Sequence, residues 1–312
     1  MLETRLDDTR ITAARSVIDP VFLDTPLFPC DALDLGCALS IKLETANPVR
    51  SFKGRGTELV THLLAGSGVV CASAGNLGQA LAWSGRRRGL DVTVVASRFA
   101  PAVKLDRIRA LDAELVLVDG DFELARDRAV DISRERGIRL VEDSLDLETC
   151  EGAATIGLEL VDAPVDVVLI ALGGGAMATG IGHVLKSRRP DVEVVCVQPL
   201  GAPAMTRSWH SRRVVTTESM NTIADGVAGR RPIPEVLADL LVVADDALLV
   251  SEESIIAGMG LLLRHAGLVV EPSAALGIAA ILENRQRFAG KRVATIICGS
   301  NVDPEAYKRW VG

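Results

Sequence analysis

Apolar runs that do not alternate with polar residues recur along most of this chain, and segments of helical periodicity separate them. A strand whose two faces are both buried has such a pattern, because neither row of its side chains meets solvent. Parallel strands need crossovers, usually helical, so the pattern predicts an α/β protein with mainly parallel sheets. The strand runs, each with its turn, occupy residues 68–76, 90–97, 113–120, 138–143, 165–175, 191–199 and 291–300, and helices are expected at 77–88, 101–111, 122–136 and from about 177.

Loops rich in small residues follow three of these strands. They are SAGN (73–76), GGGAMATG (173–180) and CGSN (298–301). Ligands of open parallel sheets bind beyond the carboxyl ends of the strands, and small residues let the backbone come close to a ligand. A shared cofactor or substrate would explain all three loops, so we expect the functional site at this edge.

The composition of the 312 residues favours a globular protein with one large domain or two smaller ones. Hydrophobic residues make up 48% and charged residues 24%, which suits a packed core. Because aromatic residues make up only 3%, aliphatic side chains must fill that core. The net charge of −7 argues against a nucleic-acid partner, which would need a basic face.

The N-terminal segment and the cysteines predict a cytoplasmic location without membrane association. The segment MLETRLDDTR is charged and lacks the apolar centre of a secretory signal, and no apolar run approaches the ~20 residues that span a bilayer. The six cysteines are scattered and form no CxxC pair, so reduced thiols are expected.

The loop after the apolar run 165–172 is a candidate anion site. Gly173, Gly174 and Gly175 precede a predicted helix, and glycines there expose backbone N–H groups at a helix N-terminus, which suits phosphate. A plain glycine turn is one alternative. A dinucleotide site is another, because the spacing from Gly173 to Ala178 fits GxGxxA, but its acidic ribose partner is missing. No GK[ST] follows, which excludes a Walker loop.

Lys53 lies in the stretch SFKGRGTELV, where a glycine-punctuated turn meets an apolar helical pattern. A lysine held in a pocket can form an imine with a carbonyl compound. Such a lysine together with a phosphate site suggests pyridoxal 5′-phosphate, an aldehyde that carries a phosphate. A solvated lysine at a helix start is the other interpretation.

Six segments occur in the order found in one enzyme family: ETANPVRSFKGRG, SAGNLGQALA, ALGGGAMATGI, NTIADGVAG, VVEPSAALGIAAIL and ICGSNVD. Over roughly residues 20–305 the chain resembles the fold-type II pyridoxal-phosphate enzymes of the threonine dehydratase and serine racemase family. The resemblance implies two open twisted, mainly parallel sheets flanked by helices, as in the tryptophan synthase β-subunit. It also implies a large cofactor-binding domain (1–66 and 146–312), a small mobile domain (67–145) and a homodimer. Because no second domain follows Gly312, the C-terminal regulatory domain of biosynthetic threonine dehydratases is not expected.

The resemblance implies a role for each matching position. Lys53 would form the internal Schiff base and then act as the base at the substrate Cα, and Phe52 would pack beside the cofactor ring. Asn76 would hydrogen-bond the 3′-oxygen of the ring. The phosphate would lie against the backbone of Gly173, Gly174, Gly175, Ala176 and Met177, the substrate carboxylate against Ser73, Gly75, Asn76 and Leu77, and the pyridine nitrogen against Cys298.

Cys298 would have a chemical consequence at that position, because a thiol is a neutral partner for the pyridine nitrogen. A carboxylate would keep the nitrogen protonated and make the ring a stronger electron sink. A neutral partner stabilises a carbanion less, which favours loss of a leaving group from Cβ over transamination. An inert buried cysteine is the alternative.

Three positions depart from the family pattern. Arg50 replaces the usual glycine before SFK, and it would either bind an anionic substrate side chain or point to solvent. Leu77 replaces a histidine, which keeps a backbone N–H but removes a side-chain contact. Ala74 stands where serine racemase has a serine on the opposite face of the substrate. Because racemisation needs acid–base groups on both faces, we rank a racemase below a dehydratase.

Three further segments bear on the site. Gln198, Ala202 and Ala204 replace the acidic ligands of racemase-like members, so no metal site is predicted. Glu271 is either an acid near the cofactor or a partner for a nearby cation. The segment VEDSLDLETCEGAAT (141–155) matches its family counterpart only loosely, which leaves that wall of the site undefined.

The sequence therefore predicts a pyridoxal-phosphate dependent lyase of the threonine/serine ammonia-lyase type. Such a dehydratase of amino-acid metabolism would remove water from L-threonine, L-serine or a 3-hydroxyaspartate-like substrate and give a 2-oxo acid and ammonia. The alternatives are a β-replacement enzyme resembling cysteine synthases, an amino-acid racemase, and a non-catalytic protein that binds the cofactor or an amino acid.

Overall fold

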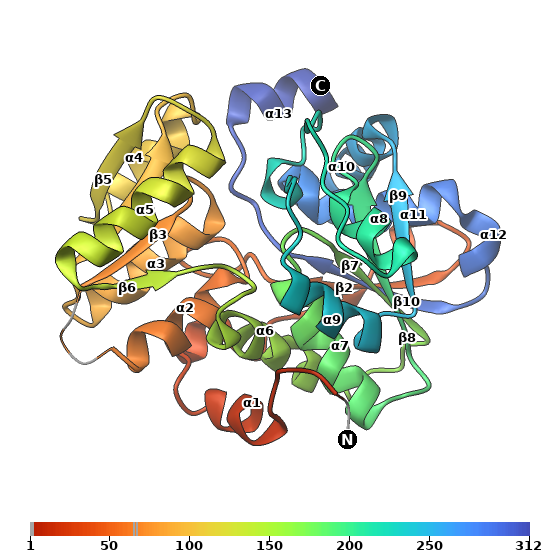
Figure 1. Cartoon of the computed structure of the whole chain (residues 1–312). Coiled ribbons are helices and arrows are strands. Elements are labelled where there is room, and N and C mark those ends of the chain that lie inside the picture. The colour runs from red at the N-terminus through yellow and green to blue at the C-terminus, as the bar shows by residue number, and fades with distance from the viewer. Residues whose placement is uncertain (1–2, 65, 67) are drawn as a thin grey trace.

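Two sheets lie side by side in the computed structural model, which describes residues 3–64, 66 and 68–312 (Figure 1). The larger sheet has the strand order β1-β2-β10-β7-β8-β9, and the smaller one has the order β5-β4-β3-β6. The strands are β1 (Leu27–Pro29), β2 (Ala38–Leu43), β3 (Val69–Ala72), β4 (Val92–Ser97), β5 (Glu114–Val118), β6 (Arg139–Val141), β7 (Val167–Ala171), β8 (Glu193–Pro199), β9 (Asp246–Val250) and β10 (Arg292–Ile297).

All neighbouring strand pairs of the described residues except one are parallel. The exception is β1, a short edge strand that runs antiparallel to β2 with Leu27 opposite Lys42. The predicted α/β class with two mainly parallel sheets is therefore confirmed. Helices join the strands, as parallel pairing requires.

The helices of the described residues are α1 (Asp8–Ala14), α2 (Lys53–His62), α3 (Asn76–Arg87), α4 (Ala102–Arg109), α5 (Phe122–Arg136), α6 (Leu147–Leu160), α7 (Ala176–Arg188), α8 (Ala204–Ser211), α9 (Pro234–Val243), α10 (Glu252–Ala266), α11 (Leu276–Glu283), α12 (Arg285–Phe288) and α13 (Pro304–Val311). The helix predicted at 122–136 has those bounds in α5. The helix predicted from about residue 177 begins one residue earlier. None of the described helices is long and apolar enough to cross a membrane.

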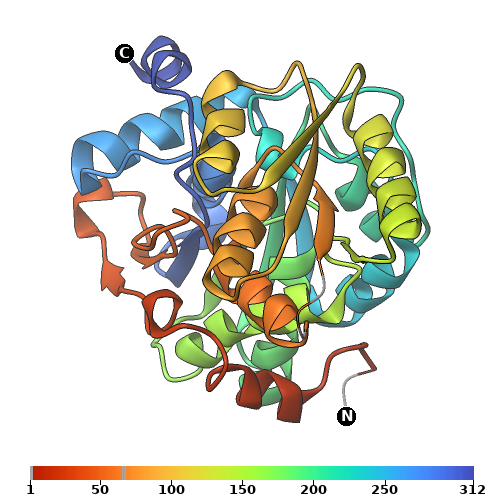
Figure 2. The same ribbon diagram turned by 90° about the vertical axis from the view of Figure 1, so that its left-hand side faces the viewer.

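Helices cover both faces of the small sheet, which explains its unbroken apolar strands. Val69 of β3 packs in one cluster with Leu81 of α3. The next residue, Val70, packs in another cluster with Ala129 and Ile132 of α5. Figure 2, in which the small sheet faces the viewer, shows the large sheet behind it. Residue 67, where the small domain is predicted to begin, lies outside the described residues.

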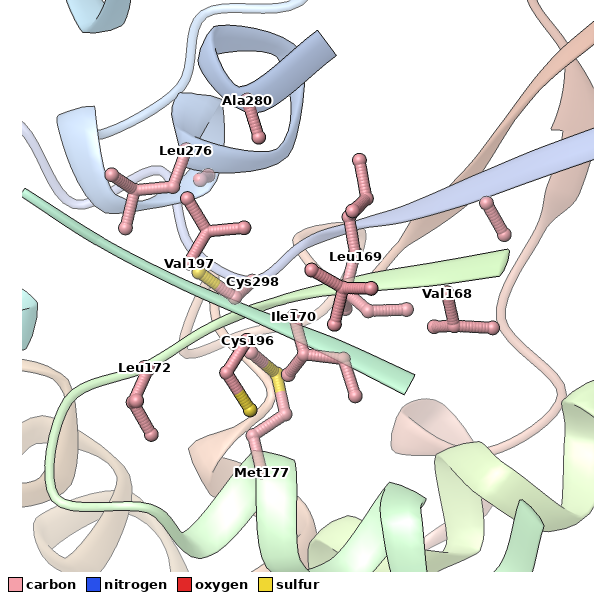
Figure 3. Packing of buried hydrophobic residues seen from close by; sticks show 14 of the residues in the cluster. Val168, Leu169, Ile170, Leu172, Met177, Cys196, Val197, Leu276, Ala280 and Cys298 are labelled. Carbon is pink, nitrogen blue, oxygen red and sulfur yellow. The ribbon is translucent and has the colours of Figure 1, made fainter. Parts of the chain in front are cut away.

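The large sheet has the same layered organisation around β7 and β8. Figure 3 shows Leu276 and Ala280 of α11 on one side of these strands and Met177 of α7 on the other. Burial of each large aliphatic side chain contributes about 1.5–3 kcal/mol. Cys298, the residue after β10, belongs to the same core cluster. The hydrophobic core therefore extends to the end of this strand, where the predicted site lies.

Candidate active site

The segment before Lys53 is joined to the end of β10. Ser51 forms an isolated bridge with Gly299, and the Phe52 N–H donates to the Cys298 carbonyl at 3.1 Å. Helix α2 then begins at Lys53 itself, as the helical pattern predicts. The lysine is therefore fixed beside the segment CGSN, which is far from it in the sequence.

The glycines after Lys53 are explained by close packing of α2. A Cβ on Gly54 would lie 2.2 Å from the Phe22 ring. A Cβ on Gly56 would lie 2.8 Å from the backbone of α6, and one on Gly152 of α6 would lie 2.5 Å from Gly56. The two helices approach so closely that neither position has room for a side chain.

A buried ion network anchors the first turn of α2. The Arg55 guanidinium is fully buried and donates to Glu44 at 2.9 Å and to Glu159 at 2.6 Å. Lys42 also donates to Glu159, at 2.5 Å. Burial alone would raise the pKa of Glu159, but the hydrogen bonds from Arg55 and Lys42 outweigh it and lower that pKa to about 2. The charges are thus compensated, and α2 is held against β2 and α6.

The Lys53 side chain points to a carboxylate from another part of the chain. Its Nζ lies 2.5 Å from Asp143 Oδ2, and it lies 4.5 Å from the centre of the Phe52 ring. Asp143 is the only carboxylate within 4.0 Å of this Nζ in the described residues. The Lys53 side chain is 15% exposed, so the ion pair is shielded but not sealed from solvent.

Asn76, the first residue of α3, has its amide orientation fixed by two neighbours. Its Nδ2 donates to Glu271 Oε1 at 2.8 Å, and its Oδ1 accepts from Asn301 Nδ2 at 2.8 Å. Asn301 also donates to the Val49 carbonyl, at 2.8 Å. The SAGN and CGSN segments, which both follow strands, therefore meet Glu271 of the segment VVEPS at one amide.

Glu271 is a buried acid beside that amide. Burial raises its pKa to about 7, while the hydrogen bond from Asn76 acts in the opposite direction. No lysine, arginine or histidine of the described residues forms a salt bridge with it, so its contacts favour an acid near the cofactor over a partner of a cation. A Cβ on Gly299 would lie 2.4 Å from this carboxyl group, which explains the glycine there.

The glycine loop between β7 and α7 presents free backbone donors. The N–H groups of Gly173, Gly174 and Gly175 have no acceptor within the described residues. The Ala176 N–H differs, because it donates to Ser144 Oγ at 3.0 Å. Gly175 has φ +110°, which only glycine adopts without strain. Three of the five predicted phosphate donors are therefore available; the role of all five, Met177 included, stays a prediction.

The SAGN loop offers a second set of donors. The Gly75 N–H donates to Ser73 Oγ at 3.2 Å, and the Ser73 N–H belongs to the sheet ladder through Val95. The N–H groups of Ala74 and Asn76 have no acceptor within the described residues. These two donors remain for a substrate carboxylate. The Leu77 side chain is buried in the core of the small sheet, so only its backbone is near the loop.

Cys298 is buried, and its thiol is kept neutral. Burial raises its pKa well above the ordinary value, and the nearby Glu271 carboxyl group raises it further. This thiol therefore meets the predicted requirement for a neutral partner of the pyridine nitrogen. Its contact with the pyridine nitrogen stays a prediction.

Arg50 has an unusual backbone and an exposed side chain. Its φ is +54°, in the left-handed region, and its carbonyl accepts from the Ser300 N–H at 3.0 Å. Its guanidinium has no carboxylate within 4.0 Å in the described residues. Whether it meets the substrate stays a prediction.

Sequence reasoning missed two residues of this site. Asn301 lies in the quoted CGSN segment, but its link to Asn76 spans 225 positions and has no local signal. Asp143 follows β6 in the loosely matched segment 141–155. The rule that pointed to three strand ends applies equally to β6, and it would have found this carboxylate.

Residues 18–299 match the family model described as "Pyridoxal-phosphate dependent enzyme". This chain belongs to that family. The match covers the lysine, the asparagine block, the glycine loop and Cys298. The sequence-based recognition of a fold-type II pyridoxal-phosphate enzyme is thereby confirmed.

Curated relatives of this pyridoxal-phosphate enzyme share about a third of its residues. An "L-threonine ammonia-lyase" of Thermotoga maritima is 35% identical over 274 residues, covering 86% of this chain and 68% of the relative. A catabolic L-threonine dehydratase of Staphylococcus aureus strain N315 is 31% identical over 305 residues, covering 94% of this chain and 88% of the relative.

Solved structures agree with these relatives. The processed form of threonine deaminase isoform 2 from Solanum lycopersicum has a TM-score of 0.89 at 28% identity, covering 97% of this chain and 93% of that one. Maize serine racemase has a TM-score of 0.91 at 26% identity, covering 97% and 96%.

The site residues of this enzyme fit its cofactor, pyridoxal 5′-phosphate. Lys53 supplies an amine for the aldehyde, and the three free N–H groups at the N-terminus of the 13-residue helix α7 suit a phosphate. Asn76 and Cys298 supply a fixed amide and a neutral thiol for the ring.

Proposed function

We propose that this chain is a pyridoxal-phosphate dependent dehydratase that removes water from L-threonine or L-serine and releases a 2-oxo acid and ammonia. The observation that carries the proposal is the connection of Lys53, through Asp143 and the adjacent Ser144, to the N-terminus of α7. The amine and the phosphate donors are thus neighbours. The similarity to an L-threonine ammonia-lyase and an L-threonine dehydratase supports the substrate class.

Each group of the chain has a defined task in this reaction. The free N–H groups of Ala74 and Asn76 hold the α-carboxylate, and Lys53 Nζ takes the proton from Cα. The N–H groups of Gly173–Gly175 hold the phosphate of the cofactor. When bound, the cofactor supplies an electron sink for the charge that develops at Cα. The neutral Cys298 thiol favours departure of the β-hydroxyl over transamination.

The test is a panel of L- and D-β-hydroxy amino acids scored for 2-oxo acid and ammonia. L-Threonine or L-serine should give both products in equal amounts, and Lys53→Ala should abolish them while the protein stays folded. Release of the opposite enantiomer without ammonia would indicate a racemase instead. Spectral changes of the bound cofactor on adding amino acids, without any product, would indicate a binding protein.

An anionic substrate such as 3-hydroxyaspartate is tested on the same panel with Arg50→Gly. Glycine suits φ +54°, so this variant keeps the local backbone. If the guanidinium binds a second carboxylate, kcat/KM for the anionic substrate falls relative to threonine. Unchanged relative kcat/KM values would leave Arg50 in solvent.

We also propose that residues 67–145 form a small domain that moves against the rest, and that the protein is a cytoplasmic homodimer. The separate four-stranded sheet of residues 69–141 supports the first statement. The six free cysteines agree with a reducing compartment. Sedimentation of the protein with bound cofactor tests the dimer.

A further inference from the structure

Arg107 of α4 lacks the ion pair that the other partly covered arginines of this chain have. In the part of the chain that the structure describes, every other arginine without a salt bridge is exposed to solvent. The Arg107 side chain is half-buried, and its hydrogen-bond acceptor there is an amide oxygen, Asn301 Oδ1, at 2.6 Å. A partly buried charge without a counter-charge is unfavourable, so this position favours an anion that comes from outside the chain.

Asn301 places the Arg107 guanidinium next to the candidate active site. The Asn301 side chain is buried, and its Nδ2 donates to Asn76 Oδ1 at 2.8 Å. The backbone N–H of Asn76 is one of the two free donors that the proposed function assigns to the α-carboxylate. A single amide group therefore separates Arg107 from the side chain of a residue that would bind the substrate.

Arg50 is a second arginine without a salt bridge in the same region. Its carbonyl accepts from the Ser300 N–H at 3.0 Å, and the Val49 carbonyl accepts from Asn301 Nδ2 at 2.8 Å. Residues 49–50 are thus bonded to the same segment that binds Arg107. Burial lowers the pKa of the Arg107 guanidinium, and the positive charge of Arg50 lowers it further. Two like charges that repel each other at this distance would both be stabilised by one shared anion.

The carboxylates around the two arginines have other partners. Asp106, which precedes Arg107 in the chain, pairs with Arg109 at 2.8 Å. Asp225 pairs with Lys104, one turn before Arg107 on α4. Glu271 accepts from the Asn76 side chain and from the backbone of residue 301. The positive charge of the two guanidiniums is therefore not balanced by a salt bridge within the described residues.

We propose that Arg107, together with Arg50, binds a second carboxylate on the side chain of the substrate. The inference rests on the proposed function and narrows its substrate class. The preferred substrate is then a dicarboxylic β-hydroxy amino acid such as 3-hydroxyaspartate, and threonine and serine are poorer substrates of the same reaction. The α-carboxylate has its own backbone donors, whereas a guanidinium matches the two oxygens of a further carboxylate.

Binding of succinate and butyrate to the protein with bound cofactor tests this site without turnover. Succinate has the carboxylate spacing of 3-hydroxyaspartate, and butyrate has the same number of carbons but a single carboxylate. Calorimetry should show that the wild type binds succinate about tenfold or more tightly than butyrate. Arg107→Gln should remove most of this preference, because glutamine keeps a donor for Asn301 and lacks the charge. Arg107→Lys should keep part of it.

Turnover should follow the same order. In Arg107→Gln, kcat/KM for 3-hydroxyaspartate relative to threonine should fall by about tenfold or more. Arg109→Gln is the matched control, because it removes one positive charge from the same helix at an exposed position that pairs with Asp106. It should keep both the binding preference and the kcat/KM ratio. A fall of equal size in this control would indicate general electrostatic attraction and would overturn the proposal.

Equal losses of succinate and butyrate binding in Arg107→Gln would assign Arg107 to the α-carboxylate or to the orientation of Asn301, and would also overturn the proposal. A wild type that binds inorganic phosphate tightly but does not prefer succinate would have a site for a free anion, which is a third contrary result. If the succinate preference depends on Arg107 but no β-hydroxy amino acid yields a 2-oxo acid, the proposed function fails and the carboxylate site stands. If threonine is converted without any succinate preference, the proposed function stands and this inference fails.

Discussion

Burial disfavours the charged form of Glu271. Its folded-state pKa of about 7 is above the ordinary 4.5, so its contribution to stability is present below pH 4.5 and is lost as the pH rises through about 7. Glutamine keeps the size of the side chain and removes the charge. Between acidic and mildly alkaline solution, the wild type should lose up to about 3 kcal/mol of unfolding free energy through Glu271. Glu271→Gln should not show this loss, because glutamine does not titrate.

Urea unfolding of the cofactor-free proteins at about pH 5 and about pH 8 measures this difference. Only the change between the two pH values matters, because the lost hydrogen bonds from Asn76 and Asn301 affect both. Equal wild-type-to-variant differences at the two pH values would show that Glu271 does not titrate in this range.

Single residues of the site were predictable where a sequence block carries them. Lys53, Asn76 and the glycine loop lie in blocks with a chemical reason for their residue types. Asp143 could have been placed at the site from its position after β6, but its pairing with Lys53 could not, because nothing local marks a contact between residues 90 positions apart. The orientation of the Asn76 amide likewise depends on side chains from two other segments.

Among the elements, α2 depends on its buried ion network. Arg55→Ala would leave Glu44 and Glu159 without their shared guanidinium, in surroundings from which water is excluded. Removing one partner of a buried ion pair costs about 3–5 kcal/mol. We expect a loss of this size in the free energy of unfolding, measured from the urea midpoint.

Arg109→Ala is the control at a helix surface. Its partner Asp106 is exposed, and such a pair contributes less than about 0.5 kcal/mol. A loss for Arg55→Ala no larger than for Arg109→Ala would mean that α2 is held by packing alone.

The same network explains why one strand, β2, was not predicted. Strands with unbroken apolar runs were predictable because helices bury both faces. β2 was not predicted, because Lys42 interrupts its apolar pattern and is buried only through its bonds to Glu159 and the Thr25 carbonyl. The short edge strand β1 and the strand β9 were also missed, and β9 has two half-buried leucines instead of a fully buried run.

For the whole molecule, ion pairs join the small sheet to the segment 225–231. Lys104 of α4 pairs with Asp225, and Arg230 pairs with Asp121 at 2.9 Å. The carboxylates of both pairs are exposed while Lys104 and Arg230 are largely covered, and such partly exposed pairs contribute little to global stability but hold segments whose local stability is low. Lys104→Ala with Arg230→Ala should therefore change the unfolding free energy by less than about 1 kcal/mol and accelerate hydrogen exchange in residues 225–231.

Hydrogen exchange with mass spectrometry, with and without added salt, measures this effect. Salt should accelerate exchange more in the wild type than in the double variant, which keeps only the longer Arg231–Glu123 pair at 3.8 Å. Arg128→Ala is the control, since its pair with Glu135 lies within α5. Unchanged exchange in the double variant would mean that other contacts hold the segment.

The Asn301 side chain has a consequence for recombining this enzyme with its relatives. Asn301 follows a strand of the large sheet, yet it bonds to Asn76 of α3 and accepts from Arg107 of α4 at 2.6 Å. A chimera that takes residues 68–145 from one parent and the remainder from another divides this trio between two ancestries. A working chimera should take positions 76, 107 and 301 from the same parent. The residues that must be exchanged together are therefore neighbours in space but not in the gene.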